Sequence, residues 1–337
     1  MNYDSSLAKE SHITKTTQTI EAVIPNVSSK PRILNVDQML EEAGGFGNWS
    51  LVVFLYGSIS SLGLTIYFAS LPFLELVPRL ECKQGSQWIE CTKQDICHNG
   101  ELADESLWRV DYTDQFSFRN WMTELQLYCY SDFWIGLFGS LCILGVALNG
   151  VILKQADHFG RRKMLIFTCI AQTMSCLVLF YTTSIYVIYV VLFSEGLLFS
   201  KNYLVYIYCV EVICSKHQVF YGAIVLAMEA TIPKVLNVAY LYFCNPETRD
   251  LCNFCIYGAV TALIALCFSL VIPESPRYLY EKKMWKELRE AISFIASFNK
   301  VEMDEAYLID EQEKDNSDSQ RLLLATHEKS NIQDQAL

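Results

Sequence analysis

Charged residues are scarce in this sequence. Asp, Glu, Lys and Arg make up 19% of its 337 residues, below the roughly 25% of an ordinary soluble domain, whereas 52% are hydrophobic. That balance argues against a soluble enzyme and favours a membrane protein. The net charge of −11 also argues against a nucleic-acid partner, because the acidic residues concentrate in the polar loops and the C-terminal tail.

The usual sequence patterns of catalysis and metal binding are missing too. The chain has no Gly-x-Ser-x-Gly, His-Glu-x-x-His, phosphate-binding loop or Gly-x-Gly-x-x-Gly pattern. Its five histidines are dispersed, and none has a Cys or carboxylate partner at metal-ligand spacing. We therefore expect no enzymatic activity, no cofactor and no metal site.

The first 50 residues contain no apolar core of the kind that a secretory signal needs. They mix Ser, Thr, Asn and Lys, and they predict a cytosolic tail that is disordered or weakly helical. Within this tail, residues 36–44 predict a short amphipathic turn that stops at Gly44. The first apolar run, which begins at Leu51, is then expected to serve as an uncleaved signal anchor.

Six long apolar runs follow, each close to the roughly 20 residues that cross a bilayer as a helix. They cover residues 51–77, 133–153, 164–182, 185–209, 219–243 and 251–272. We expect a six-helix transmembrane bundle over residues 51–272, with Gly57 and Gly63 allowing close helix packing. Residues 273–309 predict a cytosolic segment whose amphipathic helix lies on the membrane surface or against the bundle, and residues 310–337 predict a disordered tail.

The segment 79–131, between the first two runs, is too long and too charged to be a simple turn. Four of the thirteen cysteines lie in it: Cys82, Cys91, Cys97 and Cys129. An even number of cysteines in one polar loop predicts two disulfides in an oxidising compartment, and three pairings are possible. A zinc site fits less well, because the spacing offers no Cys-x-x-Cys pair.

Basic residues in the short connections predict the orientation in the membrane. One side carries Lys154, Arg161, Arg162, Lys163, Lys216, Arg277, Lys282, Lys283, Lys286 and Arg289. The short connections of the other side carry only Arg249. We expect the first side and both termini to face the cytosol, and the cysteine-containing loop to lie outside the cell.

Four ionisable residues interrupt the fourth and fifth runs: Glu195, Lys201, Glu229 and Lys234. Each costs roughly 2.5–3.5 kcal/mol near the middle of a bilayer, so each needs a reason to be there. They either line a polar pathway that meets a substrate or protons, or form internal ion pairs such as Lys201 with Glu229. Further candidates for such a pathway are Asn149, Tyr203, Tyr206 and Tyr208.

A short polar stretch, residues 155–163, separates the second and third runs and predicts a tight loop at the membrane surface. It resembles the loop signature of the major facilitator superfamily, Gly-x-x-x-Asp-Arg-x-Gly-Arg-Arg. The matching residues are Asp157, Gly160, Arg161 and Arg162. Leu153 and His158 stand where that signature has its first Gly and its first Arg.

A second resemblance is more specific. Residues 273–279, Pro-Glu-Ser-Pro-Arg-Tyr-Leu, are similar to the segment that follows the sixth span in the organic cation, carnitine and organic anion transporter family. Glu211 stands in the place of a family Glu after the fourth span, and residues 36–47, 121–129 and 291–299 resemble further family segments in order. The resemblance covers about residues 36–300.

The resemblance implies the N-terminal six-helix half of a major facilitator fold, an all-α membrane protein whose two halves rock in alternating access. It implies transport of small organic ions, whether cations, zwitterions or anions, across the plasma membrane. It also implies a cytoplasmic gate made of Asp157, Gly160, Arg161, Arg162, Glu211, Glu274 and Arg277. In this gate Asp157 lies beside a helix N-terminus, and Arg161 and Arg162 pair with Glu211 and Glu274.

Three possibilities stay open at this stage. Since the family fold has two halves and the sequence shows one, the chain is either part of a carrier, a homodimer of halves, or a half that binds or regulates a membrane partner without transporting. The expected partners are the lipid bilayer, a small organic ion and, in the second and third cases, another transporter chain.

Overall fold

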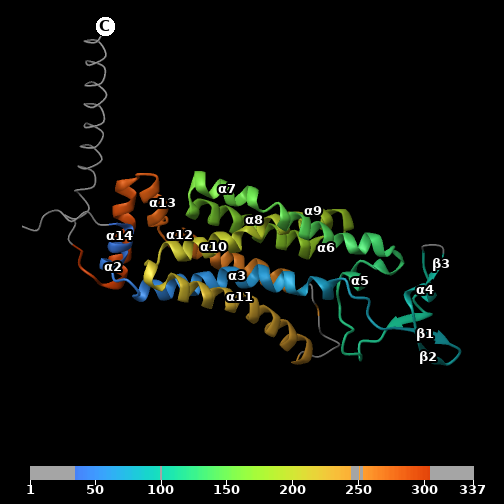
Figure 1. Cartoon of the computed structure of the whole chain (residues 1–337). Coiled ribbons are helices and arrows are strands. Elements are labelled where there is room, and N and C mark those ends of the chain that lie inside the picture. Colours follow the sequence, from blue (N-terminus) through green and yellow to red (C-terminus); the bar gives the residue numbers. More distant parts are fainter. Residues whose placement is uncertain (1–34, 99–100, 244–249, 251–252, 304–337) are drawn as a thin grey trace, which may run out of the picture. The chain divides into compact units, whose positions relative to one another are not determined.

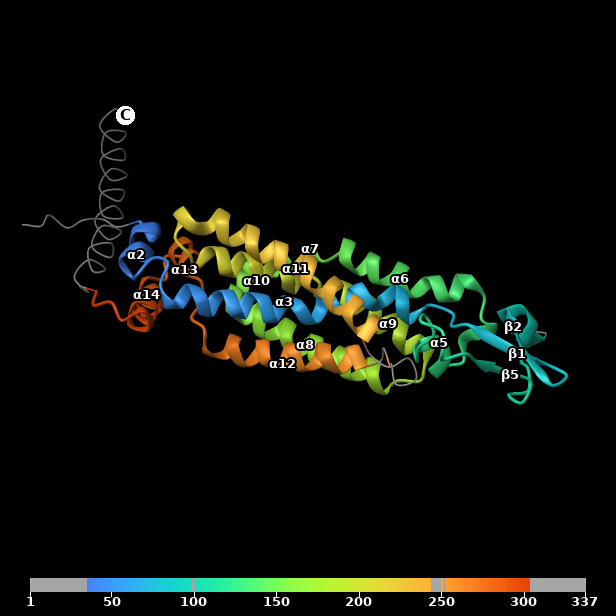
Figure 2. The same cartoon turned by 90° about the horizontal axis from the view of Figure 1, so that it is seen from below.

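The computed structural model describes residues 35–98, 101–243, 250 and 253–303. Within them, six helical spans are long and apolar enough to cross a membrane, which confirms the expected six-helix membrane bundle. The spans are α3 (Asn48–Leu74), α6 with α7 (Asp132–Ala147 and Gly150–Phe159), α8 (Arg161–Tyr181), α9 with α10 (Ile185–Leu198 and Ser200–Glu211), α11 (Ser215–Phe243) and α12 (Asn253–Val271). Figures 1 and 2 show these helices running side by side. The predicted tails, residues 1–34 and 304–337, lie outside the described residues.

The first span, α3, is central to the packing because it contacts α10, α11 and α12. Two small residues permit this close approach. A Cβ atom on Gly63 would lie 1.9 Å from Oγ1 of Thr261 on α12. A Cβ atom on Gly57 would lie 3.1 Å from Sγ of Cys209 on α10. The packing expected from these two glycines is therefore present, and neither position accepts a larger side chain without movement.

The second and fourth spans pack backbone against backbone. A Cβ atom on Gly145 of α6 would lie 2.2 Å from the carbonyl oxygen of Phe193 on α9. A Cβ atom on Gly196 of α9 would lie 2.1 Å from the carbonyl oxygen of Cys142 on α6. Because neither site has room for a side chain, the two glycines set the distance between α6 and α9.

The segment between the first two spans forms what we call the disulfide end of the bundle, and it contains small sheets that the sequence did not predict. A three-stranded antiparallel sheet has the order β2–β1–β5, with β1 (Leu80–Gln84), β2 (Gln87–Cys91) and β5 (Trp108–Val110). Gly85, with φ +66°, lies in the two-residue turn that joins β1 to β2. The remaining elements are α4 (Lys93–Ile96), β3 (Cys97–His98), β4 (Glu101–Leu102), α5 (Trp121–Glu124) and the 3-10 helix η1 (Leu127–Cys129).

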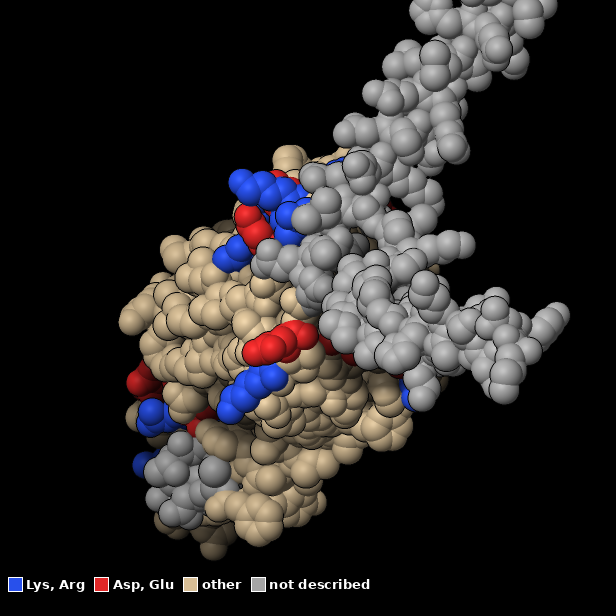
Figure 3. All heavy atoms as spheres, turned by 90° about the vertical axis from the view of Figure 1, so that its left-hand side faces the viewer, with Lys and Arg blue, Asp and Glu red and all other residues tan. Residues whose placement is uncertain are grey.

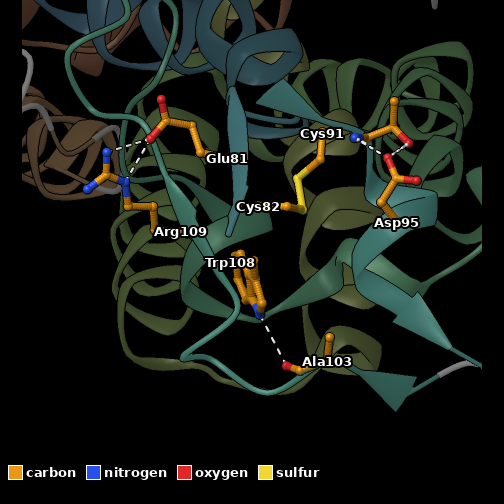
Figure 4. Close-up of a disulfide and its surroundings, with 8 residues drawn as sticks. Glu81, Cys82, Cys91, Asp95, Ala103, Trp108 and Arg109 are labelled. Atoms are coloured by element: carbon orange, nitrogen blue, oxygen red, sulfur yellow. Dashed lines mark hydrogen bonds and ion pairs between the residues drawn. A yellow bond between two sulfur atoms is a disulfide. The ribbon is translucent and has the colours of Figure 1, made fainter. Parts of the chain in front are cut away.

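Two disulfides hold this end, Cys82–Cys91 and Cys97–Cys129. The prediction of two disulfides in this loop is confirmed, and the structure selects one of the three possible pairings. Figure 4 shows the Cys82–Cys91 bridge between β1 and β2, close to Trp108 of β5. The indole N–H of Trp108 donates to the carbonyl oxygen of Ala103 at 3.1 Å. Cross-links of this kind stabilise a segment that is too small to bury a large core of its own.

Glu75 follows α3 at the disulfide end and lies half-buried against Gly139 of α6. Burial raises the pKa of its carboxyl group from 4.5 to about 7, although a hydrogen bond from the Gly139 backbone opposes the change. A carboxyl group whose pKa is raised on folding stabilises the fold fully below its unfolded-state value, and this stabilisation is lost as pH rises through the folded-state value.

We therefore expect the Tm of the chain in lipid nanodiscs to decrease as the pH is raised from about 5 to about 8. The variant Glu75→Gln should lose most of this slope, because the amide does not titrate. Glu90 is exposed on β2, so Glu90→Gln should keep the slope of the unmodified chain. An unchanged slope in Glu75→Gln would show that another group causes it.

Three short helices cover the other end of the bundle, which we call the arginine end: α2 (Val36–Glu42), α13 (Pro276–Glu281) and α14 (Trp285–Asn299). Figure 1 shows them close together. The apolar side of α14 faces α13, α2 and α3. It buries Leu288, Ala291, Ile292, Ile295 and Ala296. The sequence left two positions open for this helix, on the membrane surface or against the bundle. In the structure α14 packs against the bundle.

Asn299, the last residue of α14, bonds to the end of α2 and to the start of α3, both of which are far from it in the sequence. Its Nδ2 donates to the carbonyl oxygen of Ala43 at 2.8 Å, and its Oδ1 accepts from the backbone N–H of Trp49 at 2.8 Å. Gly47 precedes α3 and has no side chain to cap it, so Asn299 provides the cap. This explains why the first span starts at Asn48, before the predicted Leu51.

Replacing Asn299 with alanine is expected to destabilise the chain by about 2 kcal/mol, because a buried N–H and a buried C=O each lose their partner. The measurement is the Tm of the variant in nanodiscs. Ser297→Ala is the matched control, since the hydroxyl group of Ser297 donates to the carbonyl oxygen of Phe294 in its own helix. Equal Tm values for the two variants would contradict the capping role of Asn299.

Candidate functional site

The polar stretch between the second and third spans is not the tight loop that the sequence predicted. Residues 155–159 belong to α7, and α8 begins at Arg161, so Gly160 alone separates the two helices. Gly160 has φ +102°, and a Cβ atom on it would lie 2.5 Å from Oε2 of Glu274. A glycine is therefore required here both by the backbone conformation and by the space that Glu274 occupies.

Glu274, which lies between α12 and α13, caps the N-terminus of α8. Its Oε1 accepts from the backbone N–H of Arg162 at 2.9 Å and from that of Ser275 at 3.1 Å. Burial raises the pKa of the Glu274 carboxyl group, although these backbone bonds oppose the shift. Asp157, which was expected beside a helix N-terminus, is in the last turn of α7, and Glu274 caps the N-terminus of α8 instead.

The side chain of Arg162 reaches the C-terminal end of α12. Its guanidinium group donates to the carbonyl oxygens of Ser269, at 3.2 Å, and of Leu270. These last-turn carbonyls lack partners within their own helix, and a cation next to them is favourable. The expected side-chain pair of Arg162 with Glu274 is therefore replaced by two helix caps. Glu274 caps the N-terminus of α8, Arg162 caps the C-terminus of α12, and the two contacts join these helices.

Arg161 forms the contact that the sequence suggested. Its guanidinium group pairs with Glu211 at the end of α10, 3.2 Å away, and also with Asp157. The side chain of Arg161 is 12% exposed and that of Glu211 is 17% exposed, so solvent screens the pair only in part. The ring centroid of Tyr278 lies 5.8 Å from the Arg161 guanidinium carbon.

A second ion pair at the same end joins Arg277 of α13 to Asp37 of α2. The hydroxyl group of Ser215, at the start of α11, donates to Asp37 at 2.7 Å. Burial alone would raise the pKa of Asp37, but the Ser215 hydrogen bond and the charge of Arg277 outweigh it and lower the pKa. Figure 3 shows acidic and basic side chains adjacent to one another on this end.

We use the name arginine cluster for Asp37, Asp157, Arg161, Arg162, Glu211, Ser215, Glu274 and Arg277. Its contacts tie together α2, α7, α8, α10, α11, α12 and α13. Each of these contacts lies within the same six-helix unit. The cluster can therefore hold the ends of the helices as one body, and its role in a gate stays a prediction.

A pocket of about 490 Å³ opens between the first, fourth and fifth spans. Its lining residues are Thr65, Phe199, Asn202, Tyr203, Tyr206, Leu226, Glu229 and Ala230. Four of them, at positions 199, 202, 203 and 206, follow the spacing of one helix face. Apolar and aromatic surface with a few polar groups is typical of a small-molecule site.

Among the residues that the structure describes, Glu229 is the only charged one that lines this pocket. Its Oε1 accepts from Nδ2 of Asn202 at 2.9 Å, which orients the carboxylate from the neighbouring helix. Aromatic rings and a carboxylate are the groups that bind organic ammonium ions, through the face of the ring and through charge. The pocket therefore has the chemistry to bind a small organic cation.

The other charged candidates for the pathway do not line this pocket. Lys201 points into the core, where it is 1% exposed and donates to Oε1 of Gln172. Lys234 is exposed on α11, and Glu195 is buried in α9. No ion pair between Lys201 and Glu229 forms among the described residues, so that alternative is wrong.

The uncharged candidates divide in the same way. Asn149 lies at the break between α6 and α7, away from the pocket lining. Tyr203 and Tyr206 line the pocket, whereas Tyr208 is buried and donates to the carbonyl oxygen of Pro273 at 2.9 Å. Thr65, Phe199 and Asn202 were not predicted from the sequence. The helical spacing of Phe199 and Asn202 with the two tyrosines was a signal for two of these three.

A second pocket, of about 530 Å³, opens near the disulfide end between α3, α11 and α12. Ile66, Leu236, Phe254 and Val260 give it a mainly apolar wall. Asp250 and Asn253 also line it, at the edge of the sixth span, but most of its wall is apolar. The pocket at Glu229, in which polar groups make up more of the wall, is the better candidate for a substrate site.

A family model and several curated proteins match this chain. The family model described as "Sugar (and other) transporter" matches residues 108–333. The chain is similar to Solute carrier family 22 member 4 of Mus musculus, with 24% identity over 63% of this chain and 36% of the relative. It is also similar to Organic cation transporter-like protein of Drosophila melanogaster, with 23% identity over 83% of this chain and 54% of the relative.

The matches thus span about half or less of the length of these curated relatives. Among solved structures, the chain is similar to a partially occluded inward open conformation of the xylose transporter XylE from E. coli. That likeness has 16% identity and a TM-score of 0.45, and it covers 82% of this chain and 60% of the other.

Proposed function

Because the chain belongs to the sugar and other transporter family, as an organic cation transporter type member of the major facilitator superfamily, we propose that it moves small organic cations across the plasma membrane. We choose a cation because Glu229 is the only charged residue among the described residues that line the pocket. The sequence alone left cations, zwitterions and anions open, since two lysines and two glutamates lie in the fourth and fifth spans.

The placement of the two lysines is what favours a cation. Lys201 is turned away from the pocket and Lys234 is outside its lining, so no basic side chain among the described lining residues meets an anion. A carboxylate substrate would face Glu229 with like charge. An ammonium ion meets the same carboxylate and the rings of Phe199, Tyr203 and Tyr206.

The proposed mechanism is alternating access, in which a six-helix unit moves as a body against a second unit. The arginine cluster supports this by joining the helix ends of one unit, so that the unit tilts without deforming. In this proposal Asp157, Gly160, Arg161, Arg162, Glu211, Glu274 and Arg277 keep the role of a cytoplasmic gate. We also propose that the arginine end and both termini face the cytosol, and that the disulfide end faces the oxidising exterior.

Uptake into vesicles that contain this chain alone tests the proposal. We expect saturable uptake of a labelled quaternary ammonium ion, no uptake of a carboxylate of similar size, and loss of uptake in Arg161→Ala. Arg161→Lys is the matched variant that keeps the charge but not the planar group that meets two carboxylates. Uptake no greater than in empty vesicles would contradict autonomous transport.

A second candidate is a half that binds or regulates a membrane partner, or pairs with a second copy, without transporting alone. The observation that favours it is that the second and fifth spans are the least buried of the six inside the unit. The exposed residues include Phe133, Ile143, Leu144 and Val151 on the second span, and Val219, Phe220, Leu226 and Val235 on the fifth. Cation binding by the purified chain without uptake would favour this candidate.

A further inference from the structure

A group of polar side chains lies in the interior of the six-helix unit, outside the lining of the pocket at Glu229. Glu195 on α9 is 0% exposed, and Lys201 on α10 is 1% exposed. The helix break at Phe199 lies between them. No ion pair joins the two in the part of the chain that the structure describes. Two separate ionisable groups are therefore buried where a charge is expensive.

The hydrogen bonds of this group leave one oxygen atom without a partner. Oε1 of Glu195 accepts from the thiol of Cys176 on α8 at 3.7 Å, and Lys201 donates to Gln172. Oε2 of Glu195 is buried and has no hydrogen-bond partner among the described residues. A carboxylate ion with a bare oxygen in an apolar core is highly unfavourable, whereas a proton on that oxygen removes the charge.

The titratable neighbours of Glu195 supply little to hold it as an anion. They are the thiols of Cys142 on α6, Cys176 on α8 and Cys255 on α12, the phenol of Tyr67 on α3 and the ammonium group of Lys201 on α10. A thiol is a weak donor, and the hydrogen bond recorded for Lys201 goes to Gln172. The surroundings of Glu195 in this arrangement of the helices therefore favour the neutral, proton-bound carboxyl group.

We propose that Glu195 is a proton-binding site inside the six-helix unit. One proton from water adds to Oε2 and converts the carboxylate to a neutral carboxyl group, and its release reverses the step with no other bond changed. Asn202, which lines the pocket, directly follows Lys201 on α10, so the backbone of this helix connects the pocket lining to the buried group. If the proposed transport holds, this proton is released to the opposite side and couples transport to a pH gradient.

Infrared difference spectroscopy of the full chain in lipid nanodiscs detects the proton without any transport. We expect the carbonyl band of a protonated carboxyl group at neutral pH, lost in Glu195→Gln and kept in Glu229→Gln. Cys176→Ala keeps the carboxyl group but removes the hydrogen bond to Oε1, so it should shift the same band to higher frequency. This variant decides the question even where Glu195→Gln does not fold. A band that neither Glu195→Gln nor Cys176→Ala alters would overturn the proton site.

The coupling is tested in proteoliposomes that take up a quaternary ammonium ion. An imposed pH gradient should change the uptake rate of the unmodified chain several-fold, and Glu195→Gln should take up the ion at a rate independent of the gradient. Gradient dependence that survives in Glu195→Gln would overturn the coupling. No uptake by either protein would overturn the proposed transport and the coupling with it, while the infrared band still decides the proton site.

Discussion

Replacing Glu229 with glutamine is expected to weaken the binding of a tetraalkylammonium ion by about 10- to 100-fold. Glutamine has the size of glutamate and can still meet Asn202, so the change removes the charge and little else. A contact with a charged group contributes about 1.5–3 kcal/mol, and each 1.4 kcal/mol is tenfold in affinity. Equilibrium binding of the labelled ion to the chain in nanodiscs measures the effect.

Lys234→Gln is the matched control for this experiment. Lys234 is on the same helix, and a residue five positions away on a helix points about 140° from Glu229. We expect the affinity of this variant to equal that of the unmodified chain. An unchanged affinity in Glu229→Gln, or an equal loss in Lys234→Gln, would remove Glu229 from the site.

Replacing Gly196 with alanine is expected to cost about 3 kcal/mol of stability, the upper part of the range for overpacking a core. The new Cβ atom would lie 2.1 Å from the carbonyl oxygen of Cys142, which is main chain and cannot turn aside. The second and fourth spans would have to separate, and Gly145→Ala should act in the same way. The measurement is the Tm of each variant in nanodiscs.

Gly136→Ala is the control for this pair of variants. Gly136 is also in α6, and a Cβ atom on it would meet nothing within 4 Å. Alanine has the higher helix propensity, by about 1 kcal/mol, so this variant should be as stable as the unmodified chain or more so. Similar Tm values for Gly136→Ala and Gly196→Ala would contradict the close packing of α6 on α9.

The number of spans was predictable from the sequence because a bilayer demands long apolar runs and the chain has six of them. The ends of the helices were not predictable, because residues far away in the sequence cap them. Asn299 caps the first span, and Glu274 caps the third. A local pattern contains neither partner, so Glu274 was assigned to a side-chain ion pair and Asp157 to the cap.

The pocket was predictable only in part, for a related reason. Every face of a membrane span is rich in apolar residues, so hydropathy alone does not tell which face meets the pocket. Asn202 lines it, and Lys201, one position earlier, points about 100° away and into the core. The helical spacing of Phe199, Asn202, Tyr203 and Tyr206 contained this information, but only the position of α11 shows that Glu229 completes the set.

Equilibrium binding of two labelled ions of similar size and opposite charge, a tetraalkylammonium ion and an aromatic carboxylate, tests the proposed cation site most directly. The purified chain in nanodiscs should bind the cation saturably, lose that binding in Glu229→Gln and bind the carboxylate no better than empty nanodiscs. Carboxylate binding as tight as that of the cation, or tighter, would contradict the account.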